Sequence, residues 1–205
     1  MKLSILVPTH NRPKLFTRCL NAILPQLRSD IQVIVNNDSC DIQEISHPNV
    51  AYHYNKFEHL SSVYKFLLEQ STGEYVYFSE DDDYVVKDFT SILLDADLIG
   101  GNYYPKYHQS NTLPCMTLYK DVRYNSFESF NDATNKFHLQ LSQYIFKRSS
   151  IINFPFPLNS DIHNDLKLVM HAAQNATSIK SVNKILFHQT IDGNDNISFP
   201  HLQQR

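Results

Sequence analysis

The feature that most constrains the fold is an alternation of short apolar runs with segments of helical periodicity over residues 3–90. The runs at 3–7, 31–35, 50–54 and 75–78 are typical of buried strands, whereas apolar residues recur at helical spacing over 14–27 and 60–68. Strands joined by helices form largely parallel sheets with right-handed crossovers. The order of elements therefore predicts an α/β domain with a Rossmann-like, mostly parallel sheet flanked by helices.

Polar clusters follow the first, second and fourth of these apolar runs, with the sequences PTHNRP, NNDS and SEDDD. In sheets of this kind, ligands bind in the crevice beyond the carboxyl ends of the strands. Because all three clusters come at such ends, we expect them to meet around one crevice.

The chain beyond residue 90 has a less regular pattern. Strand-like runs at 116–119 and 144–147 lie among loops rich in Asn, Tyr and Ser, a helix is predicted over 164–175, and one or two strands over 179–187. The polar residues 190–205 are typical of a loop. Since no repeat and no clear boundary interrupts the chain, we expect residues 1–205 to form a single domain.

The acidic run Glu80, Asp81, Asp82 and Asp83 directly follows the apolar run at 75–78. Adjacent carboxylates repel one another unless a cation or strong hydrogen-bond donors lie among them. Oxygen ligands suit a hard divalent cation, Mg²⁺ or Mn²⁺, which can also bridge to a diphosphate. A solvated acidic turn is the alternative interpretation. The position at the end of a buried strand favours a binding site.

Composition and targeting signals narrow the functional class. The formal net charge of −3 predicts no broad attraction to nucleic acid or to anionic membranes. The 3 cysteines are far apart and form no CxxC pair, which argues against a disulfide framework or a thiolate zinc site. The apolar start LSILV is too short for a signal peptide, and no run approaches the ~20 apolar residues of a membrane span. We therefore expect a soluble, cytoplasmic protein.

Three segments in combination, SILVPTHNRP, IQVIVNNDSCD and STGEYVYFSEDDDYVVKDF, resemble family-2 glycosyltransferases with the GT-A fold. A later segment, HNDLKLVMHAA, is similar to the acidic element that opens a helix in that family. The resemblance covers roughly residues 3–90 and, more thinly, 160–198. It implies an inverting, metal-dependent transferase. Its first half (about 1–90) would bind a nucleotide sugar, and its second half (about 91–205) would bind the acceptor and supply the catalytic base.

The same resemblance implies which residues bind the donor. Glu80 and Asp82 match the two acidic positions of the family's DxD element, and Asn37 stands where the family usually has an Asp that accepts from uracil. A UDP-sugar is the expected donor. The implied nucleotide-sugar-binding residues are Thr9, Asn11, Arg12, Asn37, Asp38, Lys65, Glu80 and Asp81.

A divalent ion, Mn²⁺ or Mg²⁺, is the cofactor that the resemblance implies, with Asp82 and Asp83 as ligands. The family often adds a late His to the metal. His188 is the nearest candidate here, and Asp192 is the alternative.

Asp165 matches the catalytic base of the family. A carboxylate there would take the proton of the acceptor hydroxyl while this attacks the anomeric carbon, and a single displacement inverts the configuration. The family usually has Glu before this Asp, whereas this chain has Asn164. A helix N-terminal acid that favours the helix dipole is the alternative role for Asp165.

Other functions and acceptors fit parts of the sequence. Asp81, Asp83 and Val85 fit the DxDx[TV] pattern of the haloacid-dehalogenase phosphatases. The Thr or Ser, the Lys and the acidic pair that should follow later in such a chain are not found. A sugar-nucleotide-binding protein with a decayed site is the non-enzyme alternative.

For a transferase, the resemblance implies a surface glycan or glycolipid as acceptor. The small, Gly-poor, Asn- and Tyr-rich chain also resembles phage proteins, for which a modified nucleic-acid base would be the acceptor. The aromatic and basic stretch 103–124 would then stack on bases, although an ordinary acceptor-binding loop is the interpretation that we favour for it.

Overall fold

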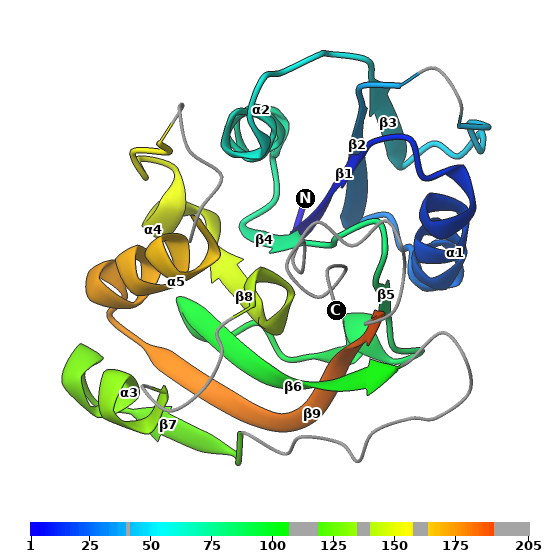
Figure 1. Ribbon diagram of the computed structural model, residues 1–205. Coiled ribbons are helices and arrows are strands. Elements are labelled where there is room, and N and C mark those ends of the chain that lie inside the picture. Colours follow the sequence, from blue (N-terminus) through cyan, green and yellow to red (C-terminus); the bar gives the residue numbers. More distant parts are fainter. Residues whose placement is uncertain (40–41, 107–118, 135–139, 158–163, 191–205) are drawn as a thin grey trace, which may run out of the picture.

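The computed structural model describes residues 1–39, 42–106, 119–134, 140–157 and 164–190. Its strands form one sheet in the order β3-β2-β1-β4-β8-β6-β9-β5, with β7 paired to β9 (Figure 1). The elements are β1 (Leu3–Thr9), α1 (Pro13–Ile23), β2 (Ile31–Asn37), β3 (Val50–His53), α2 (Leu60–Gln70), β4 (Tyr75–Phe78), β5 (Tyr84–Val85), β6 (Leu98–Lys106), β7 (Val122–Tyr124), α3 (Phe127–Thr134), β8 (Tyr144–Lys147), α4 (Arg148–Ile151), α5 (Asn164–Asn175) and β9 (Ile179–Thr190).

The first half of the sheet is parallel. The pairs β1–β2, β2–β3 and β1–β4 all run in the same direction, and the register places Thr9 opposite Asn37 at the ends of β1 and β2. In the second half β6 and β9 are parallel, whereas β8 runs antiparallel to both β4 and β6. The α/β fold with a large, mostly parallel sheet is therefore confirmed, and its less regular second half is a mixed extension of the same sheet.

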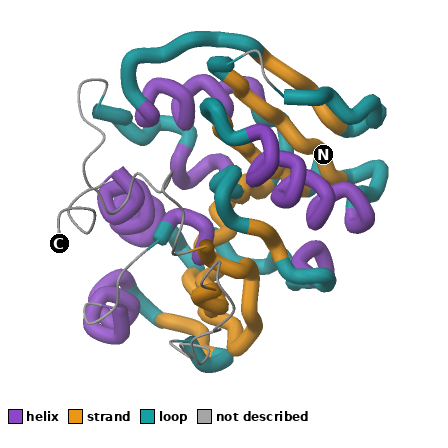
Figure 2. Tube along the Cα trace, turned by 45° about the vertical axis from the view of Figure 1, so that its right-hand side comes forward, coloured by secondary structure: helices purple, strands orange, loops and turns teal. Residues whose placement is uncertain are grey.

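Helices cover both faces of the sheet (Figure 2). On one face, α1 packs Phe16, Leu20 and Ile23 against the inward residues of β1 and β2. On the other face, α2 and α5 pack with Leu6 of β1 and Phe78 of β4 in a second apolar cluster. Each β1 side chain is buried on whichever face it points to, because both faces carry helices.

Several elements of the second half were not predicted. No strand was expected over 98–106 or 122–124, and no helix over 127–134. The predicted elements at 144–147, 164–175 and 179–187 are present. Strand β6 contains Gly100, Gly101 and Pro105, which have low strand propensity, so its pairing with β8 and β9 decides its conformation. Residues 116–118 and the tail 191–205 lie outside the described residues, and Tyr119 is not in a strand.

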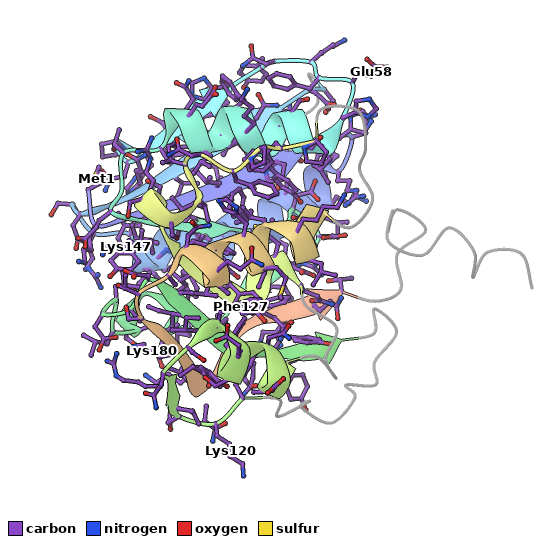
Figure 3. The ribbon with its side chains drawn as sticks, turned by 90° about the vertical axis from the view of Figure 1, so that its left-hand side faces the viewer. Met1, Glu58, Lys120, Phe127, Lys147 and Lys180 are labelled. Carbon is purple, nitrogen blue, oxygen red and sulfur yellow. The ribbon has the colours of Figure 1, made fainter. Side chains whose placement is uncertain are left out.

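Charged side chains tie elements together at the end of the sheet where β1 and β4 begin. Asp97 precedes β6 and accepts from Lys147 Nζ at 2.9 Å and from the Thr177 backbone N–H at 2.8 Å. Lys180, almost fully buried, donates to the Leu93 carbonyl at 2.7 Å. Figure 3 shows Lys147, Lys180 and Met1 along the same side of the molecule. These contacts stabilise the fold at the end opposite the acidic run.

None of the helices in the described ranges combines the length and the apolarity that a membrane span requires.

Candidate functional site

The loops that follow β1, β2 and β4 meet at one edge of the sheet. Thr9, at the end of β1, donates its hydroxyl to Asp81 Oδ2 at 2.8 Å, and β4 lies beside β1 through the Ser79 N–H to Leu6 carbonyl bond of 2.9 Å. Asn37 ends β2 opposite Thr9 in the parallel register. The expected convergence of the three polar clusters is therefore present, with Thr9, Asn37 and the acidic run on the same edge.

Arg12 is the cation at the centre of this edge. Its Nη1 donates to Asp81 Oδ1 at 3.0 Å and to Asp82 Oδ2 at 3.1 Å, and its side chain is only 12% exposed. Pro13 begins α1 directly after Arg12. Arg12 therefore lies at the end of the loop that follows β1, where its side chain reaches the acidic run. Burial raises the pKa of Asp81 to about 6, although Arg12 acts in the opposite direction. The guanidinium thus compensates only part of the clustered negative charge.

Glu80 lies between helix α2 and the start of helix α5. The buried Tyr64 of α2 donates its hydroxyl to Glu80, while burial and the nearby Asp165 carboxylate raise the pKa of Glu80 well above its usual value. Asp165, half-buried in the first turn of α5, is therefore close to the acidic run. The structure thus brings Asp165, the predicted base, close to Glu80, the first residue of the acidic run. Tyr64, which bonds to Glu80, was not predicted as part of the site.

Asp83 contacts the end of β9. Its Oδ1 accepts from the Thr190 backbone N–H at 2.9 Å, and burial with the adjacent Asp82 raises its pKa well above the usual value. Arg18 of α1 reaches the same place, because its Nη2 donates to the Asp82 carbonyl and to Thr190 Oγ1, the latter at 2.7 Å. Sequence reasoning missed Arg18, whose partners are far away in the chain.

His188 lies on β9 in the antiparallel pair with β5. Its ring stacks on Tyr84 at 4.8 Å between centroids, with an interplanar angle of 16°, and Tyr104 of β6 lies against it at 5.7 Å. His188 is two residues from Thr190, whose backbone N–H contacts Asp83. It is thus placed near the acidic run within an aromatic stack, whereas Asp192 lies outside the described residues.

The loops after β1 and β2 are bonded to each other. Asn37 Oδ1 accepts from the Ser39 N–H at 3.0 Å and from the Ser39 hydroxyl at 2.8 Å, which closes a tight turn. Asn11, with a φ of 51°, donates its N–H to Ser39 Oγ at 3.0 Å, and Asp38 pairs with the His10 ring. Asn tolerates this left-handed backbone better than most residues do. The amide of Asn37 is therefore engaged within its own turn, while Asp38 and His10 are the more exposed groups.

Lys65 is not brought into contact with the acidic run. It lies on the outer face of α2, where its ammonium is 3.9 Å from Glu69 and its side chain is 48% exposed. The inward face of this turn belongs to Tyr64, the residue before it.

The carboxylates of the acidic run each contact different protein groups. Among the residues that the structure describes, no three His, Cys, Asp or Glu side chains converge in a way that would hold a metal ion. Asp82 is more exposed than Asp81, and its Oδ2 shares the Arg12 guanidinium with Asp81. Hard oxygen donors suit Mg²⁺ or Mn²⁺. The carboxylate of Asp82 thus has the donor chemistry that suits such an ion.

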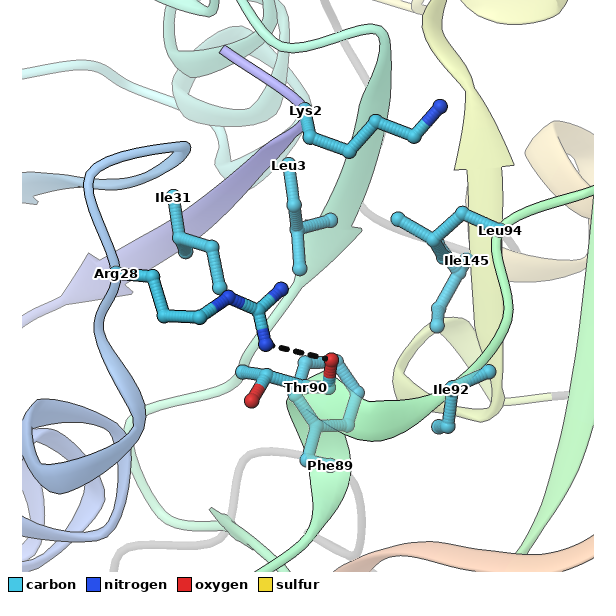
Figure 4. A pocket seen from close by; sticks show the side chains of 9 residues that line it. All are labelled: Lys2, Leu3, Arg28, Ile31, Phe89, Thr90, Ile92, Leu94 and Ile145. Atoms are coloured by element: carbon cyan, nitrogen blue, oxygen red, sulfur yellow. Dashed lines mark hydrogen bonds between the residues drawn. The ribbon is translucent and has the colours of Figure 1, made fainter.

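A small pocket lies at the opposite end of the strands (Figure 4). Leu3 and Ile31, which begin β1 and β2, line it together with Phe89, and Arg28 donates to the Thr90 carbonyl at its rim. Because β1 and β2 point away from it, this pocket is separate from the edge that carries the acidic run.

Comparisons with known proteins agree with this architecture. The structure of S. aureus TarS 1–349 superposes with a TM-score of 0.74 at 19% identity, covering 93% of this chain and 60% of that one. The same TarS segment in complex with UDP-GlcNAc gives a TM-score of 0.70 at 20% identity, over 97% of this chain and 61% of that one. These similarities show a shared fold, and they confirm the GT-A fold expected from the sequence.

Sequence comparisons name a family. Glycosyltransferase GlyA of Streptococcus pneumoniae serotype 4 is 27% identical over 118 residues, which are 50% of this chain and 17% of GlyA. The chain thus spans a small part of GlyA and about three fifths of TarS 1–349. The profile of glycosyl transferase family 2 matches residues 4–153, most of the chain. The chain belongs to glycosyl transferase family 2.

Proposed function

We propose that this chain transfers a sugar from a nucleotide-sugar donor, preferably a UDP-sugar, to an acceptor hydroxyl. The observation that carries the proposal is the convergence of Thr9, Arg12 and Asp82 on one edge, with Asp165 beside Glu80. Family membership and a fold shared with a protein that was solved with UDP-GlcNAc support a nucleotide sugar as the donor.

Arg12 and Asp82 are the groups that we assign to the donor diphosphate. A guanidinium forms strong, directional hydrogen bonds to phosphate oxygens. Asp82 would hold Mn²⁺ or Mg²⁺, and an ion bound there would supply positive charge for the departing diphosphate. Asp83 and His188, the other ligands expected from the sequence, contact Thr190 and Tyr84 in this structure. Asp82 is therefore the first ligand to test.

Asp165 is the residue that we assign as general base. Its carboxylate lies in the first turn of α5, where the helix dipole favours negative charge. Burial and the nearby Asp165 charge raise the pKa of Glu80 well above its usual value. An ionised Asp165 would accept the proton of an attacking hydroxyl, and a single displacement inverts the anomeric configuration. A glycan or glycolipid hydroxyl is the acceptor we propose.

The phosphatase alternative requires Asp81 to be a nucleophile. Both Asp81 carboxylate oxygens already accept hydrogen bonds, from Thr9 and from Arg12, and the residue is only 4% exposed. Such a carboxylate is poorly placed to attack a phosphomonoester, and this argues against the phosphatase alternative.

A donor screen tests the proposed function. We expect UDP-sugars with Mn²⁺ to raise the thermal unfolding temperature more than GDP-, CMP- or dTDP-sugars do, because a ligand that binds only the native state stabilises it. EDTA should remove most of the shift. Equal shifts with all nucleotide sugars, or none with any, would contradict the donor assignment.

The Asp165→Asn variant tests the base. Removing a general base costs about 10²–10⁴-fold in rate. We therefore expect transfer, or slow donor hydrolysis, to fall by such a factor while the affinity for UDP stays within about threefold. Asp132→Asn, an exposed change on α3, is the matched control. Undiminished turnover by Asp165→Asn would clear this residue of the role.

A further inference from the structure

We propose that Arg18 and Asp83 are positioning residues that fasten the end of β9 to the acidic run and thereby orient Asp82. We call Arg18, Asp83 and Thr190 the β9 clamp. The inference deepens the proposed function, since it assigns Asp83 to the support of the donor site and not to the metal. Neither the sequence motifs nor the family comparison pointed to Arg18.

Arg18 joins two segments that are distant in the chain. Its Nη2 donates both to the Asp82 carbonyl and to Thr190 Oγ1, and its guanidinium lies over the Tyr84 ring with 4.9 Å from Cζ to the centroid. Its Nε is buried without a hydrogen-bond partner among the described residues. A buried donor without a partner costs free energy, so the other contacts of Arg18 must hold its side chain in place. These are the hydrogen bonds of Nη2 and the contact with the Tyr84 ring, which connect Arg18 to the acidic run, to Thr190 and to β5.

Asp83 makes the second connection to β9. It is only 7% exposed, and its Oδ1 accepts from the Thr190 backbone N–H at 2.9 Å. Arg12, in contrast, contacts the carboxylates of Asp81 and Asp82. An acceptor oxygen is all that the Thr190 amide requires, so an Asn side chain can take the place of Asp83. A metal ligand, in contrast, loses much of its affinity when its charge is removed.

Asp82 is held from two sides as a result. Its carbonyl accepts from Arg18, and its carboxylate accepts from Arg12. Fixing the backbone of a ligand residue leaves fewer orientations for its carboxylate, and changing a supporting residue typically costs about 10–100-fold in metal affinity. The β9 clamp thus acts on the donor site through Asp82.

Substitutions of the acidic residues separate the two roles. We expect Asp83→Asn to keep the affinity for Mn²⁺, measured by electron paramagnetic resonance with UDP present, within about threefold of the wild type. Asp82→Asn should lower it by about tenfold or more. Asp30→Asn, at an exposed position, is the matched control. An equal loss in Asp83→Asn and Asp82→Asn would make Asp83 a ligand and overturn the proposal.

Substitutions of Arg18 test the other connection. We expect Arg18→Gln to weaken Mn²⁺–UDP binding by about tenfold and to raise KM for the donor more than it lowers kcat. Arg18→Lys should restore part of the affinity, because an ammonium can still donate to one of the two oxygens. Arg28→Gln removes an exposed arginine from the far end of the sheet and should change neither quantity. An Arg18→Gln variant that binds Mn²⁺–UDP like the wild type would overturn the role of Arg18.

Amide exchange tests the clamp without relying on the proposed function. In the metal-free protein, the Thr190 amide should exchange at least about tenfold faster in Asp83→Ala than in the wild type, and it should stay protected in Asp83→Asn. Unchanged protection in Asp83→Ala would disprove the clamp. If the wild type binds no nucleotide sugar, the proposed function fails, and this exchange measurement still decides whether the clamp exists.

Discussion

At Asp81, burial and ion pairing act on the same carboxylate in opposite directions. Burial raises its pKa to about 6, while the Arg12 charge and the Thr9 hydroxyl bond lower it. An acid whose pKa is higher in the folded state than in the unfolded state binds its proton more tightly when folded. The ionised form of Asp81 therefore costs stability that a neutral side chain of the same shape would not cost.

The Asp81→Asn substitution should reveal this cost as a pH dependence. In EDTA, we expect the wild type to lose free energy of unfolding relative to Asp81→Asn as the pH rises from about 4 to about 6, by about 2–3 kcal/mol in total. The sign follows because the folded wild type holds more protons than the unfolded chain in that window. Urea unfolding at several pH values measures the difference. A difference that is constant between pH 4 and 7 would contradict the raised pKa.

Lys65 and Tyr64 show what the sequence could and could not predict about the site. Neighbouring residues on a helix point about 100° apart, so the apolar positions Val63, Leu67 and Leu68 already place Tyr64 closer to the buried face than Lys65. The helical periodicity of the sequence predicts this difference. The contact between the Tyr64 hydroxyl and Glu80 joins two separate elements, so the pattern of one helix does not predict it. The meeting of the segments that carry Thr9, Arg12 and the acidic run was predicted, because strand ends in a parallel sheet share one edge.

At the scale of elements, the connection from α2 into β4 depends on the close approach of Gly73 to β1. A Cβ on Gly73 would lie 2.6 Å from the Ser4 backbone nitrogen and 2.7 Å from the Tyr75 carbonyl oxygen. Backbone atoms at such distances must shift. We expect Gly73→Ala to lower the free energy of unfolding by about 1–3 kcal/mol.

Urea denaturation followed by circular dichroism measures the effect of Gly73→Ala. Thr72→Ala, at the exposed neighbouring position, should change stability by no more than about 0.5 kcal/mol. Equal effects of the two substitutions would show that β1 and β4 accommodate a methyl group at Gly73.

Asp97 connects β6 to β8 and to the turn before β9. Although burial alone would raise its pKa, hydrogen bonds from Lys147 and Thr177 lower it to about 2. The stability that these bonds contribute is present above about pH 4 and is lost as the pH falls through 2. We expect Asp97→Asn to cost about 1–3 kcal/mol at pH 7 and much less near pH 2. Acid titration of the wild type and of Asp97→Asn, followed by circular dichroism, compares their stabilities. A stability difference that is as large near pH 2 as at pH 7 would contradict the prediction.

Strand β6 marks the limit of prediction at this scale. Its Gly and Pro residues weaken the strand propensity of its own sequence. The buried side chain of Asn102 is paired with the Tyr119 backbone, at 2.7 and 3.1 Å. Such pairing depends on residues that are distant in the chain. The helix at α5 and the strand at β9 were predicted, because their apolar patterns are local.

At the scale of the whole molecule, β4 joins the two halves of the sheet. It pairs with β1 on one side and, antiparallel, with β8 on the other, where Val76 lies opposite Phe146. The second apolar cluster likewise combines Phe78 of β4 with Phe146 and Leu168 of the second half. An isolated first half would expose both a strand edge and an apolar face.

A fragment of residues 1–90 should therefore fail to fold alone. We expect it to show no cooperative urea transition by circular dichroism, whereas the full chain unfolds in a single step. A cooperative transition in the fragment would mean that residues 1–90 form an independent domain.

The shared direction of β1, β2 and β4 has a practical consequence for handling this protein. The strands begin near Met1 and end at the acidic run. A resin, a surface or a fused reporter attached at Met1 would lie at the opposite end of these strands from the acidic run. An attachment made just after Thr190 would begin beside Asp83.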